Sequence, residues 1–196
     1  MPGVTNDHDQ LHDPGGRVRL RLAADTRSAA GFSPCRRWRT WLERRWDGRP
    51  IGAGDHAALI GMNPSVADEA ADDPTVQGCM ARARAWGFGA AVMLNAFAYR
   101  ATDKQRLLEL ADPVGPCNDA DILRLCAAAG VVVVAWGQPP RALRGRGPAL
   151  AAMLRAAGLR PMCFAINADG SPKHPLYVRR DAALVEYSQG VTGRRA

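Results

Sequence analysis

Short apolar runs alternate with helix-length segments through most of this chain, and this alternation is the feature that most constrains its fold. The clearest run is Val131–Trp136, six consecutive apolar residues of the kind that is buried on both faces of a parallel sheet. The other predicted core strands are Ala57–Met62, Ala90–Leu94 and Met162–Ile166. The pattern predicts an α/β protein, a three-layer α/β/α sandwich with a mostly parallel central sheet.

Capping residues mark the helices between these strands. Asp73 is a predicted N-cap, with Pro74 at the first position of a helix that ends before Gly87. Further helices are expected at four segments, the first of them short and capped by Thr102: Asp103–Leu110, Asp119–Ala129, Pro148–Ala157 and Asp181–Ser188.

The Arg- and Trp-rich run Arg36–Trp46 fits either a helical stripe or a strand. The turn signal Asp47-Gly48, followed by a new strand, favours a strand in an N-terminal β-hairpin. Val18–Leu22 alternates in polarity and predicts an edge strand. We expect a single α/β domain over residues 31–188, between a flexible tail over residues 1–30 and a frayed tail over residues 189–196.

The charge balance points to an anionic partner. The chain has 26 Lys and Arg residues against 19 Asp and Glu residues, and nearly all of the basic residues are arginine. Because arginine binds phosphate bidentately, we expect nucleic acid or a nucleotide-like ligand as the partner. Arg100, Lys173 and the arginines of residues 141–146 are candidate phosphate ligands, with solvated surface charge as the alternative.

Several classes of protein lose support. The five cysteines form no C-x-x-C pair, so neither a zinc site, an iron–sulfur cluster nor any other cofactor is expected. No apolar segment approaches the roughly 20 residues that span a bilayer, and the N-terminus is polar, so we expect a cytoplasmic protein without a membrane partner. The glycine-rich dinucleotide and P-loop motifs and the serine nucleophile elbow are absent. The oligomeric state is left open.

Polar residues follow each predicted core strand. Because the carboxyl ends of parallel strands share one edge of a sheet, we expect Asn63, Asn95 and His174 to face one pocket. An ordinary turn, a cap and a loop histidine are the alternatives for these three. The strand-end candidates are Asn63, Pro64, Ser65, Asn95, Gly137, Lys173, His174 and Tyr177.

These residue types suit the recognition and chemistry of a nucleobase. An Asn amide can position a water or bond a planar base, and a histidine can donate to an oxygen that gains charge or act as general acid and base. Phe97 or Tyr99 could stack on a base, although aromatic residues after a strand more often belong to the core.

From Phe32 to Leu184 the sequence closely resembles a bacterial and phage family known only as a domain of unknown function (number sixteen-forty-three). The resemblance rests on these segments: Phe32–Cys35, Leu42–Asp47, Asn63–Ser65, Asp72–Thr75, Trp86–Gly89, Asn95–Asp103, Asp112–Pro116, Ala135–Gly137 and His174–Tyr177. It implies no established activity.

A second resemblance is more distant. The order of four segments is similar to that in the uracil-DNA glycosylase superfamily. These segments are G-M-N-P-S, an apolar strand ending in Asn95, V-V-V-A-W-G and K-H-P-L-Y. The resemblance implies a glycosylase-like fold in which Asn63 positions the hydrolytic water and Asn95 reads the flipped pyrimidine. His174 would stabilise the departing base anion. Enzymes of this kind unstack their target nucleotide and bind it in a pocket.

The sequence also departs from that superfamily. Leu176-Tyr177 stand where a small serine turn is usual, and neither the segment with Asp73, a further substrate-binding candidate, nor the N-terminal hairpin belongs to its pattern. Fold carries over better than reaction. We therefore expect a glycosylase-like pocket that hydrolyses an N-glycosidic bond in nucleic acid. The alternatives are a non-catalytic nucleic-acid or nucleotide-binding module and a hydrolase of a small nucleoside-like metabolite.

Overall fold

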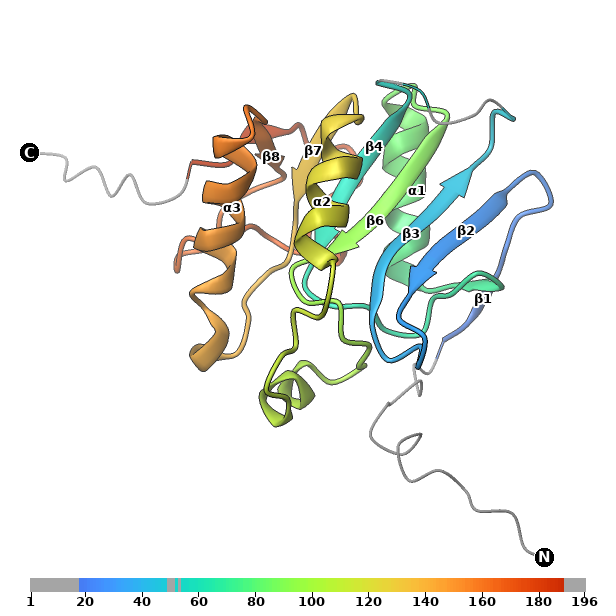
Figure 1. Ribbon diagram of the computed structural model, residues 1–196. Coiled ribbons are helices and arrows are strands. Elements are labelled where there is room, and N and C mark those ends of the chain that lie inside the picture. Colours follow the sequence, from blue (N-terminus) through green and yellow to red (C-terminus); the bar gives the residue numbers. More distant parts are fainter. Residues whose placement is uncertain (1–17, 49–51, 53, 189–196) are drawn as a thin grey trace, which may run out of the picture.

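Four parallel strands form the centre of a seven-stranded mixed sheet (Figure 1). The computed structural model describes residues 18–48, 52 and 54–188. The parallel strands lie side by side in the order β6 (Ala90–Asn95), β4 (His56–Gly61), β7 (Val131–Val134) and β8 (Pro161–Cys163). The four predicted core strands are thus present, with Val131–Val134 and Pro161–Cys163 shorter than expected. The runs on β4, β6 and β7 are almost wholly buried, as continuous apolar strands in a covered sheet should be.

Antiparallel strands flank the four parallel strands on both sides. On one side β3 (Arg39–Arg45) pairs with β6, and β2 (Arg27–Phe32) pairs with β3. On the other side β9 (Val185–Glu186) pairs with β8. The sheet is therefore mixed rather than mostly parallel. A short turn is enough to join antiparallel strands, which is why β2 and β3 add to the edge without a crossover helix.

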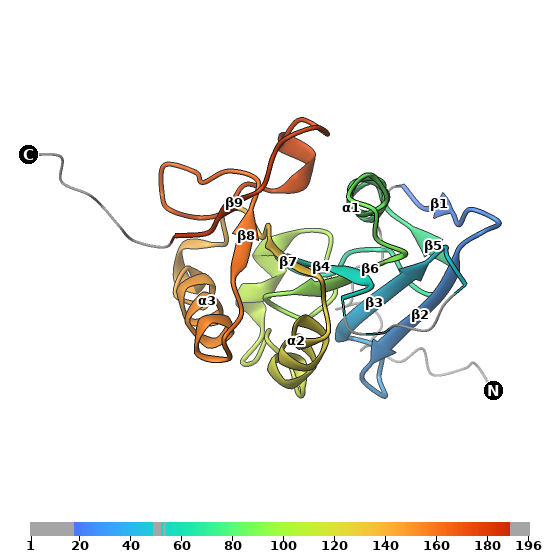
Figure 2. The ribbon, with the colours of Figure 1, turned by 90° about the horizontal axis from the view of Figure 1, so that it is seen from above.

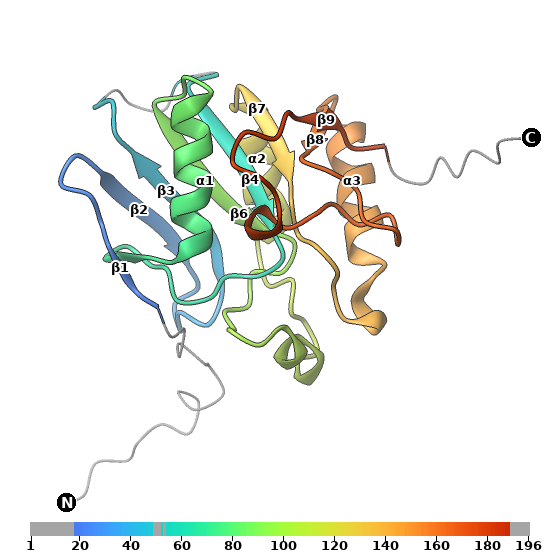
Figure 3. The same cartoon turned by 180° about the vertical axis from the view of Figure 1, so that it is seen from behind.

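Helices cover both faces of the sheet. α1 (Pro74–Ala85) lies on one face, and α2 (Asn118–Ala127) and α3 (Arg146–Ala156) lie on the other (Figures 2 and 3). Successive side chains of β4 point to opposite faces of the sheet. Ile60 packs with the helices α2 and α3, and Leu59 packs with α1. In the part of the chain that the structure describes, no helix is both long and apolar enough to cross a membrane.

The N-terminal strand pairing differs from the prediction. The run Arg36–Trp46 contains a strand, as expected, but its hairpin partner is the preceding β2 rather than a strand after Asp47-Gly48. The turn closes where Ser33 N–H donates to the carbonyl of Trp38 over 2.9 Å. The far side of β3 is occupied by β6, so the strand after Gly48 enters the sheet elsewhere, as β4. The sheet consequently begins at Arg27, inside the segment expected to be a tail.

Three local predictions also change. The prediction of a helix over Asp181–Ser188 is wrong, because this segment contains the strand β9. The ring of Tyr187 packs edge-on against Trp136 with 5.7 Å between the ring centres, and this tertiary contact favours an extended chain. The helix after residue 102 is the 3₁₀ helix η2 (Lys104–Glu109), capped by Asp103 rather than Thr102. The edge strand near Val18–Leu22 is β1 (Leu20–Arg21), which pairs with β5 (Ala71–Asp72) in a separate two-stranded sheet. Residues 1–17 and 189–196, the outer parts of the expected tails, lie outside the described residues.

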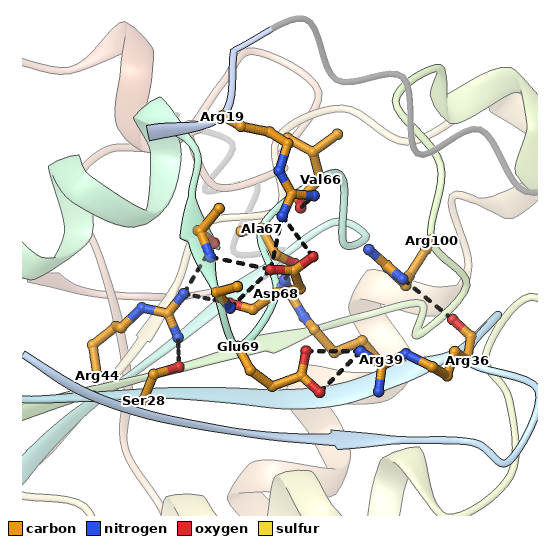
Figure 4. Close-up of polar contacts among 12 residues, drawn as sticks. Arg19, Ser28, Arg36, Arg39, Arg44, Val66, Ala67, Asp68, Glu69 and Arg100 are labelled. Carbon is orange, nitrogen blue, oxygen red and sulfur yellow. Dashed lines mark hydrogen bonds and ion pairs between the residues drawn. The ribbon is translucent and has the colours of Figure 1, made fainter. Parts of the chain in front are cut away.

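Arginines of the N-terminal hairpin and its turn hold the loop Val66–Asp72 (Figure 4). Arg44 is fully buried and donates to the carboxylate of Asp72 over 2.7 Å and to the carbonyl of Asp68 over 2.6 Å. Arg36 forms a two-armed ion pair with Glu69, at 2.9 and 2.7 Å. This loop joins the end of β4 to the start of α1, so these arginines fix the geometry of the sheet edge.

Candidate functional site

A cavity of about 760 Å³ opens at the carboxyl edge of the sheet. It lies at the ends of β4, β6 and β7 and beside the first turn of α1. The chain passes from β4 to β6 on one side and later to β7 on the other, so the cavity lies where the strand order reverses. Ligands of open α/β sheets bind at such switch points. Nine of the predicted site residues line it: Asn63, Pro64, Ser65, Asp73, Asn95, Gly137, Lys173, His174 and Tyr177.

Three predicted ligand contacts lie elsewhere. Phe97 and Tyr99 are buried in the core that faces α2 and α3, where Tyr99 meets Trp38 edge-on at 5.7 Å. Arg100 is buried as well, with its guanidinium 5.1 Å from the centre of the Phe32 ring. The aromatic pair thus follows the core alternative, because the chain after β6 turns into the interior instead of along the cavity.

The basic excess does not gather at this cavity. The charged residues that line it are Arg39, Asp73, Asp103, Lys104 and Lys173. Of residues 141–146, the last arginine is tied to the carboxylate of an aspartate on α2. Other arginines, such as Arg44 and Arg82, donate to loop carbonyls inside the fold, so their positive charge has a structural role.

Asn63 presents a fixed acceptor to the cavity. Its Nδ2 group donates to the carbonyl of Pro64 over 3.0 Å and to the carbonyl of Ala101 over 2.7 Å, which uses both N–H bonds. Within the described residues, its Oδ1 atom receives no hydrogen bond. The amide can therefore accept a hydrogen bond from a water or a ligand without changing its orientation.

Asn95 is a deeply buried polar residue of the cavity. It ends β6 and is 5 % exposed, and its backbone carbonyl accepts a hydrogen bond from Asn118 over 3.0 Å. Its side-chain Nδ2 atom is buried and has no hydrogen-bond partner among the described residues. Such an unpaired donor costs about 1–3 kcal/mol, which a carbonyl oxygen of a ligand would remove.

His174 offers a neutral donor. Its Nδ1 atom accepts a hydrogen bond from the Leu176 N–H over 3.3 Å, which leaves the proton of the neutral ring on Nε2. Burial lowers the pKa of His174, and the carboxylate of Asp73 opposes this shift more weakly. The ring is therefore uncharged at neutral pH.

Two residues allow and support this placement of His174. Gly137 has φ +67°, so a side chain at this position would be strained, and its Cβ atom would lie in contact with the Cβ atom of His174, at 3.4 Å. Arg82, on α1, donates to the carbonyls of Pro175 and Val178 over 3.0 Å each and thereby anchors the His174 loop to the helix.

Arg39 is a cavity residue that the sequence did not indicate. It is 3 % exposed, and its Nη1 group donates to the carbonyl of Ala67 over 2.6 Å. Its Nε atom is buried and has no partner in the part of the chain that the structure describes. Burial lowers its pKa to about 10, so the side chain is charged at neutral pH. It belongs to a run in which several arginines look alike, and only the fold separates it from its neighbours.

Across residues 18–48, 52 and 54–188, no group of three or more His, Cys, Asp or Glu side chains is placed to hold a metal ion. The residues that line the cavity instead suit hydrogen bonding to an organic ligand.

A family model described as "Protein of unknown function (DUF1643)" matches residues 38–176, well over half of the chain. The chain belongs to this family. The region that matches the DUF1643 model runs from the turn before β3 into the 3₁₀ helix η4 (Pro175–Tyr177) and includes Asn63, Asn95 and His174. Searches of curated proteins and of solved structures gave no match.

Proposed function

We propose that this protein binds a nucleobase in the cavity and hydrolyses its N-glycosidic bond, on a uracil-DNA-glycosylase-like three-layer α/β/α fold. The observation that carries the proposal is Asn95, a buried amide with an unpaired donor in the same cavity as Asn63 and His174. A base edge that alternates carbonyl oxygens and N–H groups satisfies such an amide on both of its sides.

The reaction needs two groups besides the base reader. Water adds its oxygen to the sugar carbon, the electron pair of the broken bond leaves with the base, and the proton of the water passes to the base or the solvent. The Oδ1 atom of Asn63 would orient this water, and the Nε2–H of His174 would bond the base oxygen on which negative charge develops. A preorganised donor of this kind favours the transition state over the ground state.

The rim of the cavity favours nucleic acid as the substrate. Leu176 and Tyr177 directly follow the His174-Pro175 pair and are 53 % and 81 % exposed. Exposed apolar side chains beside a base pocket can fill the space that an unstacked nucleotide leaves in a strand.

The charge of the cavity favours a second candidate, a hydrolase of a small nucleoside-like metabolite. Of the residues that the structure describes, three basic and two acidic side chains line the cavity, too few positive charges to follow a long phosphate backbone. A non-catalytic nucleic-acid or nucleotide-binding module would use the same base contacts without turnover. Salt separates these cases, because affinity for duplex DNA should fall with a log–log slope of about −0.9Z for Z neutralised phosphates, whereas a nucleoside should bind almost independently of salt.

The proposal is tested by replacing Asn95 with leucine, a side chain of similar size that cannot form hydrogen bonds. Loss of the base contact should weaken the binding of nucleosides about 10- to 100-fold in titration calorimetry, as expected for about 1–3 kcal/mol of hydrogen bonding. Gln77→Leu, which removes an exposed amide from α1, is the matched control and should bind normally. Unchanged affinity in Asn95→Leu would rule out its role as the base reader.

A further inference from the structure

Arg39 has hydrogen-bonding capacity that the protein leaves unused. It lines the cavity, and a guanidinium offers five N–H donors, of which the carbonyl of Ala67 takes one. Among the described residues, Arg39 forms no ion pair with a carboxylate, and its Nε atom is buried without a partner. A buried charge is normally paired, so the site lacks an anion that would complete it.

The first turn of α1 faces the same cavity. Thr75 and Val76 line it, and α1 is 12 residues long, so the partial positive charge of its N-terminus acts there. The Val76 N–H is already bonded to the carboxylate of Asp73 over 2.9 Å. The Thr75 N–H lies in the first turn, where no intrahelical acceptor exists, and its hydroxyl is a further donor.

The electrostatic surroundings of Arg39 agree with an unfilled anion site. Burial is the main cause that lowers its pKa, and Arg100 and Arg44 act in the same direction. The negative charges of Asp73 and, more weakly, Asp68 oppose this decrease in pKa but do not offset burial. A bound anion would stabilise the charged guanidinium.

We propose that Arg39 and the first turn of α1 form a phosphate subsite within the cavity, so that the ligand is a nucleotide rather than a bare nucleoside. The planar guanidinium suits the two-armed recognition of a phosphate, and helix N-termini bind the same group. The nucleotide part of this inference rests on the proposed function, whereas the phosphate part does not. The phosphate is either that of a free mononucleotide or that of a strand.

Inorganic phosphate is the first probe, titrated into the full chain in a phosphate-free buffer and followed by calorimetry and ³¹P NMR. Wild type should bind it, and Arg39→Met should bind it at least about tenfold more weakly, the equivalent of about 1.4 kcal/mol. Arg124→Met, which removes an arginine paired with Asp121 on the surface of α2, is the control and should bind as wild type does. Circular dichroism checks that each variant is folded. If Arg39→Met does not fold, Arg39→Lys is the second variant. It keeps the positive charge but cannot bind phosphate through two N–H groups of a planar guanidinium, so it should still bind phosphate more weakly than wild type. Wild type that does not bind phosphate, or Arg39 variants that bind it normally, would overturn the subsite.

Nucleosides and their 5′-monophosphates are the second probe, and they separate this inference from the proposed function. Monophosphates that bind wild type more tightly than nucleosides, with the difference lost in the Arg39 variant, would support both. Phosphate binding without any nucleoside binding would support the subsite and contradict the proposed function. Equal affinity for nucleosides and monophosphates would contradict the subsite alone. Single-stranded oligonucleotides identify a strand as the source of the phosphate if they bind with a log–log salt slope of about −0.7 for each phosphate.

Discussion

Replacing His174 with alanine should slow base release by about 10²–10³, and Asn63→Ala should have an effect of similar size, because each removes one preorganised contact to the transition state. His174 would lose the donor to the leaving base, and Asn63 would lose the acceptor that holds the water. Affinity for the substrate should change little in both variants. Release of free base, measured by chromatography under single-turnover conditions, separates the rate from binding.

The pH profile tests the protonation state assigned to His174. Its pKa lies below the ordinary value for histidine because the ring is buried, so the neutral ring is the donor at neutral pH. The rate of wild type should stay level as the pH falls from mildly alkaline to neutral. Further acidification puts a second proton on Nδ1, which then faces the N–H of Leu176, and activity should fall. A rate that increases steadily on acidification would mean that a charged imidazolium is the donor.

The alanine variants have their own contradicting outcome. Full activity in His174→Ala or Asn63→Ala would show that the replaced residue has no role in the mechanism.

Replacing Arg44 with methionine should lower the free energy of unfolding by about 3–5 kcal/mol, because it leaves the buried carboxylate of Asp72 without its partner. Arg44 also holds the carbonyls of Asp68 and Ala71, so the loop between β4 and α1 should loosen in the same variant (Figure 4). Urea denaturation at neutral pH measures this loss. Arg179→Met, which removes one member of a fully exposed ion pair, is the control and should change the stability far less.

Acidification should reduce the stability loss in the Arg44 variant. Burial raises the pKa of Asp72, while Arg44 opposes this shift. Without Arg44, burial acts almost unopposed, so the folded variant binds a proton at a pH where the unfolded chain does not. Its stability should therefore rise, relative to wild type, as the pH falls from neutral toward the raised pKa of Asp72. Urea denaturation at neutral pH and at an acidic pH compares the free energies of unfolding of the variant and wild type. A difference below about 1 kcal/mol at neutral pH, or the same difference at both pH values, would contradict the role of this ion pair.

The sequence predicted the elements whose signal is local. The apolar runs that became β4, β6 and β7 and the capped helix α1 were found because burial and capping leave a pattern within a few residues. The sequence does not indicate that β3 pairs with β6, about fifty residues further along the chain, and this contact leaves the preceding β2 as the hairpin partner of β3. The strand β9 likewise depends on distant residues. Tyr187 packs on Trp136, which lies more than fifty residues earlier in the sequence, and no local pattern predicts such a contact.

The candidate site follows the same rule. Asn63, Asn95 and His174 were placed together because polar residues at the ends of parallel strands must meet at one edge. Arg39 lines the cavity from a strand, and Arg82 holds the His174 loop from a helix. The sequence neighbours of these two residues do not distinguish them from other arginines. Phe97 and Tyr99 were placed at the cavity only because they follow a strand, and the chain turns them into the core instead.

The most direct test of the central claim is the release of free base by the wild-type protein. The substrates are oligonucleotides that carry uracil, hypoxanthine or another modified base, together with nucleosides and nucleoside 5′-monophosphates, and the free base is measured by chromatography. Abasic sites in the oligonucleotides provide a second readout. We expect base to be released from at least one of these substrates and the release to be abolished in the double variant Asn63→Ala/His174→Ala. Wild-type protein that binds these compounds but releases no base from any of them would show that the cavity is a binding site without hydrolytic activity.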